Sequence, residues 1–188
     1  MILENVDRYL GLLSHYTILR QADRNLLSQK LSYCPCSTKY HGSYEGGLLD
    51  HLLNVVNVAG SLSFLFKSQL RKYEYLDTQL LLCALTHDLG KMGNVESDYY
   101  LVNPDEKKRD KEPFIVNAEL VSIPHEIRTL YWLGHLGLSQ LAEEVLQAIC
   151  YHAGPYTPGY MDLIKKEHPL LILLHSADNL AAKIMEAL

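Results

Sequence analysis

The sequence predicts an all-α fold into which one small β-hairpin is inserted. Apolar residues recur at helical spacing along most of the 188-residue chain. Two short segments within 98–117 are instead rich in Tyr, Val, Phe and Ile, which favour strands. Neither an internal repeat nor a linker divides the chain, so we expect a single domain that spans residues 1–188.

The N-terminal half is predicted to be helical. Its apolar periodicity indicates helices over 2–15, 23–33 and 46–70 and over the apolar run 80–86. Asp77 is expected to be the N-cap of the helix that contains this run, because a short carboxylate accepts hydrogen bonds from the first free N–H groups. Gly90 is expected near the end of the same helix.

The middle and the C-terminal half complete this pattern. The strands of the hairpin are predicted at 98–103 and 112–117, with the turn 104–111 between them. Four basic residues in the turn are balanced by acidic neighbours, so we interpret it as a solvated turn. Further helices are expected over 124–136 and 139–152. Pro169 suits the first position of a last helix that reaches Leu188.

The charge balance and the cysteines exclude several classes of protein. The chain has 17 basic and 22 acidic residues, a net charge of −5, which argues against a protein that coats nucleic acid. Cys34, Cys36, Cys83 and Cys150 match neither a secreted disulfide scaffold nor a zinc ribbon. No signal peptide is recognised at the start, and the uncharged stretch 52–66 is shorter than the ~18 residues of a membrane span. We therefore expect a cytoplasmic protein without a membrane partner.

Several histidines and aspartates fall where a polar group is costly. His51 lies on an apolar helical face, and His87 and Asp88 directly follow the run 80–86. Asp178 lies on the apolar face of the last helix, where an unpaired carboxylate costs several kcal/mol. Taken singly, such residues are more often hydrogen-bonded core residues. Taken together, two imidazoles and two carboxylates form a thiolate-free ligand set for a divalent ion: Mn, Co, Mg, Fe, Ni or Zn.

The order of these residues, H…HD…D, resembles the HD-domain superfamily of metal-dependent phosphohydrolases. The segments GGLLDH (46–51), HDLGK (87–91) and HSADNL (175–180) are similar to the motifs that carry the family's ligands. The resemblance extends over about 37–183. It implies the helical bundle of an HD domain, with His51, His87, Asp88 and Asp178 as ligands of one divalent ion.

The resemblance also implies roles for residues beyond this set. His125 and His152 would bind a second metal ion bridged by Asp88, so that one or two ions bind per chain. Alternatively, they contact phosphates or act as acid and base near neutral pH; a structural role at the start of a helix is also open for His125. Asp88, Lys91 and His125 are therefore the candidate catalytic residues.

Three residues are candidates for substrate binding. Lys91 follows the His-Asp pair by three residues and suits a phosphate, although a solvated lysine at a helix end is an equal alternative. Lys39 and His41 lie in a Gly/Ser/Tyr loop before the ligand helix, and their role rests mainly on the resemblance.

The expected function is hydrolysis of phosphate ester or anhydride bonds in nucleotides. The motifs look like small stand-alone HD hydrolases of phages and bacteria, which favours a (deoxy)nucleoside triphosphohydrolase or a nucleotidase. Segment 152–178 also resembles HD-domain 3′–5′ exoribonucleases, so a phosphodiesterase or 3′–5′ exonuclease on short nucleic acids is the alternative, although a nucleic-acid partner is less favoured. A non-catalytic nucleotide-binding module is a further alternative. The resemblance also favours a homo-oligomer.

Overall fold

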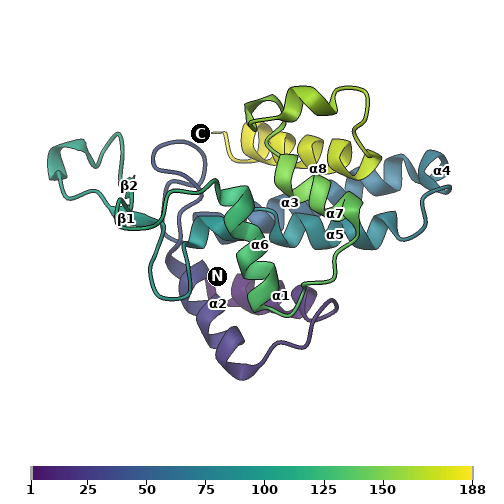
Figure 1. The fold of residues 1–188 in the computed structure, drawn as a ribbon. Coiled ribbons are helices and arrows are strands. Elements are labelled where there is room, and N and C mark those ends of the chain that lie inside the picture. Colours follow the sequence, from purple (N-terminus) through teal and green to yellow (C-terminus); the bar gives the residue numbers. More distant parts are fainter. Residues whose placement is uncertain (1, 188) are drawn as a thin grey trace.

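The structure, a computed structural model, describes residues 2–187 and is mainly helical, as predicted (Figure 1). Its helices are α1 (Ile2–Leu13), α2 (Gln21–Tyr33), α3 (Gly47–Leu65), α4 (Lys67–Leu70), α5 (Leu76–Thr86), α6 (His125–His135), α7 (Glu143–Tyr151) and α8 (Pro169–Leu180). The strands β1 (Tyr100–Val102) and β2 (Phe114–Val116) pair antiparallel. The predicted fold class, all-α with a small β-hairpin, is confirmed.

Helix α3 forms the centre of the core. It packs against α5 and α8, and α7 packs against α8, α5 and α6 (Figure 1). Leu48, Leu52 and Val55 of α3 are completely buried, as the apolar periodicity of this segment requires. Helix α1 packs against α2, α3 and α5, so the N-terminal helices close the core from below in the view of Figure 1.

The hairpin projects from one end of the helical body (Figure 1). Tyr100 pairs with Val116, and Val102 pairs with Phe114. The strands are three residues long, shorter than predicted. The turn between them is exposed, and its charges pair locally, as in the contact of 3.4 Å between Lys108 Nζ and Asp105 Oδ2.

Two predictions in the N-terminal half are wrong in detail. The helix expected over 46–70 is interrupted at Phe66, where φ is −99° and ψ is 13°, so α3 and α4 are separate. Asp77 is not an N-cap, because α5 begins one residue before it, after Tyr75 in the left-handed region at φ 63°. Its carboxylate instead accepts a hydrogen bond from Ser63 Oγ of α3.

The C-terminal helices also differ from the prediction at their ends. Helix α7 begins at Glu143 rather than at 139, whereas Pro169 is the first residue of α8, as expected. Helix α8 ends at Leu180 and passes into a π-helical turn, Ala181–Met185. The predicted end at Leu188 lies outside the described residues.

Helix α3 is long and apolar enough to cross a membrane by length and composition, with a mean hydropathy of 1.4. From the sequence, the uncharged stretch 52–66 was expected to be too short for a membrane span, whereas the helix itself covers Gly47–Leu65. The helix lies in the core, where 44% of the window is buried against the rest of the chain. Core helices pass this test of length and composition as well, so the test alone does not indicate a membrane span.

Candidate metal centre

The four residues predicted to hold a first metal ion come from three core helices and meet at the centre of the fold. His51 lies on α3, His87 and Asp88 directly follow α5, and Asp178 lies on α8. Ligand atoms of His51, His87 and Asp178 lie within 4.8 Å of one another. His87, Asp88 and His152 form a second such group, and His152 directly follows α7.

Three of the imidazoles have one nitrogen anchored by a hydrogen bond. Nδ1 of His87 lies 3.2 Å from the carbonyl oxygen of Ala84, and Nδ1 of His152 lies 2.8 Å from that of Ile149. Because a carbonyl only accepts, Nδ1 donates in both rings and Nε2 faces the cluster. In His51, Nδ1 donates to the carboxylate of Glu186 at 3.1 Å. Such an anchored second nitrogen is typical of metal-binding histidines.

The atoms that face the centre lack hydrogen-bond partners. His51 Nε2, His87 Nε2 and Asp88 Oδ1 are buried, and each makes no hydrogen bond within the described chain. His51 Nε2 and Asp178 Oδ1 are 3.2 Å apart, close enough for an ion pair but not aligned as a hydrogen bond. Buried polar atoms are nearly always satisfied, so this group of orphaned nitrogen and oxygen atoms fits a divalent cation.

The two oxygens of Asp88 face different sets of residues. Oδ2 lies 3.6 Å from Nε2 of both His51 and His87. Oδ1 lies 3.1 Å from His125 Nε2 and 3.4 Å from His152 Nε2. A carboxylate placed between two pairs of imidazoles is suited to bridge two cations, so the residues present fit either one ion or two.

The charges of the cluster shift its pKa values in opposite directions. Burial alone would raise the pKa of Asp88, but Lys91, His87 and His125 outweigh it and hold that pKa well below its usual range. Burial lowers the pKa of His87 to about 3. Burial would also lower the pKa of His51, yet Cys36, Asp178 and Glu186 around the ring raise it well above the usual value. His87 is therefore ready to bind a cation, whereas a proton competes with a metal ion for His51.

A buried threonine fixes the start of α6 next to the His-Asp pair. Thr129 Oγ1 donates to the carbonyl of His87 at 2.8 Å and accepts from the backbone N–H of Gly90 at 2.9 Å. Gly90 approaches the α6 backbone so closely that a Cβ would lie 1.9 Å from the carbonyl oxygen of His125. This contact requires glycine, and it brings His125, the first residue of α6, to Asp88.

The three predicted substrate-binding residues lie at different distances from the cluster. Lys91 Nζ lies 2.6 Å from Asp88 Oδ2, so this lysine belongs to the cluster in the structure and is not a solvated helix end. The ring of His41 lies next to that of His51, with centroids 5.1 Å apart. Lys39 is exposed and lies over the ring of Tyr40, and within residues 2–187 no contact joins it to the cluster.

Two residues beside the cluster were not anticipated from the sequence. Glu186 reaches His51 because the π-helical turn after α8 carries the chain back toward α3, and its N–H donates to the carbonyl of Ala181 at 3.0 Å. π-helical turns are rare, and nothing in the sequence predicted one after α8, so Glu186 was not expected beside His51. Cys36 lies beside Lys91, whose Nζ is 3.5 Å from its sulfur. Its position depends on the loop that precedes α3.

Comparisons with known proteins do not assign the chain to a family. No protein-family model matches the sequence, no curated protein matches it, and no solved structure matches the fold. The geometry therefore defines a helical protein with buried histidine and aspartate groups that could hold a metal ion.

Proposed function

We propose that the protein is a metal-dependent phosphohydrolase that acts on nucleotides. The supporting observation is the set of three imidazoles with anchored Nδ1 atoms, whose Nε2 atoms face the buried carboxylate of Asp88 and the half-buried carboxylate of Asp178. The order of these ligands along the chain resembles the HD-domain superfamily, and this resemblance links the metal centre to phosphoryl chemistry.

In this proposal, His51, His87, Asp88 and Asp178 hold the first ion, and His125 and His152 hold a second one on the other side of Asp88. A divalent ion at this position supplies Lewis acidity toward a phosphoryl oxygen and lowers the pKa of a nearby water molecule. Asp88 places its carboxylate between the two sets of imidazoles. Glu186 holds the ring of His51 in orientation through Nδ1.

The remaining residues of the cluster bind and orient the substrate. Lys91 is almost buried, with a side-chain exposure of 14%, and carries a compact positive charge toward the reacting phosphate. His125 is more accessible, at 25%, and its Nε2 lies at the edge of the cluster. As the alternative to holding a second ion, this nitrogen moves a proton to the leaving oxygen. His41 is half-buried in the loop before α3, with its ring next to that of His51, and contacts the rest of the nucleotide.

Nucleotides are favoured over nucleic acids as substrates on grounds of charge. The net charge of −5 gives the surface no general attraction for a polyphosphate backbone. A single nucleotide needs only local cations, and Lys91 with the bound ions supplies them. The product that is released, rather than the geometry of the cluster, identifies how many phosphates are removed.

The proposal is tested by product analysis with ion-exchange chromatography. The protein is incubated with ribo- and deoxynucleoside mono-, di- and triphosphates and with a short oligonucleotide, in Mn²⁺, Co²⁺, Mg²⁺ or EDTA. We expect metal-dependent release of phosphate, pyrophosphate or triphosphate from nucleotides. Because Asp88 contacts both sets of imidazoles, Asp88→Asn should lower this turnover by more than about 100-fold, the upper range for loss of an outer ligand partner.

The matched control is Asp105→Asn, a neutralised carboxylate in the exposed hairpin turn, which should retain full turnover. Circular dichroism of both variants checks that the helices persist. Shortened oligonucleotide with intact nucleotides would identify a phosphodiesterase instead. Nucleotide binding without any turnover would identify a binding module, and equal turnover of Asp88→Asn and wild type would place the reaction elsewhere.

A further inference from the structure

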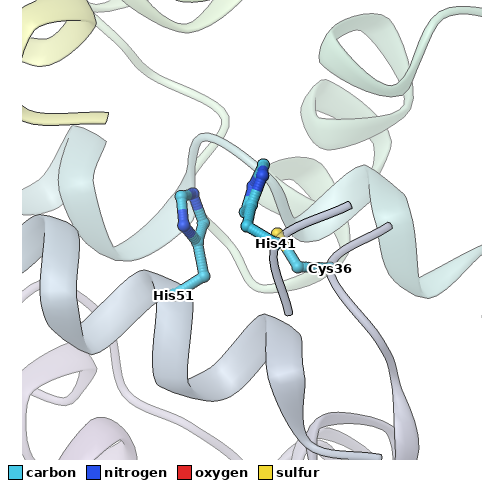
Figure 2. Close-up of side chains that lie close together, drawn as sticks. All are labelled: Cys36, His41 and His51. Atoms are coloured by element: carbon cyan, nitrogen blue, oxygen red, sulfur yellow. The ribbon is translucent and has the colours of Figure 1, made fainter. Parts of the chain in front are cut away.

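A group that contains a thiol lies beside the proposed metal centre. Cys36 and His41 lie in the loop before α3, and both side chains point toward His51 on that helix (Figure 2). One ligand atom from each of the three residues lies within 4.8 Å of the others. Cys36 is completely buried and His41 is half-buried, so the group is closed on the protein side and open at His41.

The loop is built to hold Cys36 and His41 in place. The N–H of Cys36 donates to the carbonyl of Gly42 at 2.8 Å, which closes the loop, and Ser37 Oγ donates to the carbonyl of His41 at 2.9 Å. The loop also presses on the first turn of α3, since a Cβ at Gly47 would lie 2.0 Å from the carbonyl oxygen of Gly42. The positions of the thiol and the imidazole are therefore set by backbone packing.

Two further observations indicate a ligand at this group. His51 Nε2 is buried and makes no hydrogen bond, although the ring is completely shielded from solvent. Lys91 Nζ donates toward Cys36 Sγ at 3.5 Å. Burial raises the pKa of the Cys36 thiol, and the neighbouring His51 and Lys91 partly offset this in favour of the thiolate, which is the form that binds metal ions. The group thus combines a sulfur ligand with two imidazoles.

We propose that Cys36, His41 and His51 form a second kind of metal site, for a thiophilic divalent ion such as Zn²⁺ or Cd²⁺. Sulfur and imidazole ligands select these ions over Mg²⁺ and Mn²⁺, which prefer oxygen. Binding replaces the S–H bond of Cys36 by a sulfur–metal bond and releases that proton to solvent; a proton held on His51 Nε2 leaves to solvent in the same way. Metal binding at this site does not require that the protein has phosphohydrolase activity.

Because His51 belongs to both groups, the two sites exclude each other. Nδ1 of His51 carries the hydrogen that Glu186 accepts, so Nε2 has the only lone pair that the ring offers. An ion bound by Cys36 and His41 therefore takes a ligand from the ion near Asp88. A thiophilic metal would remove an oxygen-preferring metal from the centre rather than bind beside it.

The test is a titration of the full-length, metal-free protein with Cd²⁺, followed by the ultraviolet absorption of the cadmium–thiolate bond. We expect the band to saturate at one equivalent per chain. Cys36→Ser should abolish it, and His41→Ala should weaken Cd²⁺ binding at least about 10-fold. The matched control, Cys34→Ser, changes the other cysteine of the same Cys-Pro-Cys segment and should retain the band. Absence of the band from wild type, or its persistence in Cys36→Ser, would overturn the proposal.

Whether Cd²⁺ displaces Mn²⁺ is measured in the same protein loaded with Mn²⁺. Electron paramagnetic resonance gives the concentration of free Mn²⁺ during the titration. Each equivalent of cadmium–thiolate absorption should release one equivalent of Mn²⁺. Growth of the band with Mn²⁺ still bound would show that the sites do not share His51, and so overturn the exclusion. If Mn²⁺ does not bind at all, the proposed metal centre near Asp88 is wrong. The cadmium–thiolate band still tests the proposed site of Cys36, His41 and His51.

Discussion

Asp88 is fully buried, and an ammonium group and four imidazole rings face its two carboxylate oxygens. Lys91 and two imidazoles approach Oδ2, and His125 and His152 approach Oδ1. An uncompensated carboxylate in this position would be strongly destabilising, so the surrounding donors balance its charge in the folded chain. The same balance leaves its orphaned Oδ1 available to a cation.

Glu186 is predicted to act as a positioning residue through His51. Glu186→Ala removes the acceptor of the His51 Nδ1 hydrogen bond and should weaken Mn²⁺ binding about 10- to 100-fold. Glu186→Gln should lose less, because its amide oxygen still accepts the same hydrogen bond. Isothermal titration calorimetry with Mn²⁺ measures both variants.

The control for this prediction is Ile184→Ala, an exposed position of the same π-helical turn. It should bind Mn²⁺ like the wild type. If Glu186→Ala also binds like the wild type, the carboxylate does not orient His51.

The residues of the candidate site differ in how well the sequence predicts them. His51, His87 and Asp88 are recognisable because each interrupts an apolar helical pattern locally. The contact of Glu186 with His51 spans 135 residues and depends on a π-turn, so no local pattern indicates it. No role was predicted for Cys36, since its approach to His51 depends on the closure of the loop before α3.

At the scale of elements, the helix ends decide which side chains reach the centre. His87 and His152 each follow the last residue of a helix, and each ring bonds back to the carbonyl three residues earlier. The ring thereby satisfies a free carbonyl at the helix end and is oriented in the same step. Helix centres were predicted well from periodicity, whereas helix starts such as those of α5 and α7 depend on tertiary contacts.

Gly90→Ala should disturb the site by pushing α6 away from the His-Asp turn. The added Cβ meets the backbone of His125, which cannot rotate away, so the cost should reach or exceed the roughly 1–3 kcal/mol of overpacking. We expect the melting temperature to fall by at least several degrees and Mn²⁺ binding to weaken. Thermal melting and calorimetry measure the two effects.

Gly134→Ala is the matched control, because it lies in α6 with no atom within 4 Å of the added Cβ. It should leave binding unchanged and stabilise the protein by about 0.5–1 kcal/mol, since alanine favours helix. Equal melting temperatures for both variants would contradict the close approach at Gly90.

The start of α2 contributes a pH-dependent contact to α6. Arg20 donates two hydrogen bonds to Asp23, at 2.7 and 2.8 Å, and they lower the pKa of Asp23; His135 of α6 lies 3.4 Å away. A lowered carboxyl pKa stabilises the fold above the unfolded value of about 3.9, and this stability is lost as pH falls through the folded pKa. The effect is small, because Arg20 is largely exposed.

Thermal melts of Asp23→Asn and wild type between pH 2 and 7 test this contact, a range that spans the usual carboxyl titration. The variant should melt a few degrees lower at pH 7, and the difference should disappear at the acid end. Asp110→Asn, in the exposed hairpin turn, serves as the control and should follow the wild type at every pH. A difference between Asp23→Asn and wild type that is independent of pH would exclude the titration of this carboxylate as its cause.

For the whole molecule, the centre is the place where separate helices meet. Its side chains come from α3, from the ends of α5 and α7, from the start of α6 and from α8. The all-α class and the hairpin were predictable from local patterns, because they depend on periodicity and strand propensity. The meeting of five helices at one point depends on long-range packing, and only the ordered resemblance to HD domains anticipated it.

A metal ion bound at this point should stabilise the entire fold, because the unfolded chain cannot bring these helices together. An ion present at 100 times its dissociation constant stabilises the native state by about 2.7 kcal/mol. For a chain of this length, that free energy raises the melting temperature by about 5–11 °C. Differential scanning fluorimetry in Mn²⁺ and in EDTA measures the shift. Asp88→Asn should lose it and Asp105→Asn should keep it, whereas equal melting temperatures in Mn²⁺ and EDTA for the wild type would mean that these helices meet without holding the ion.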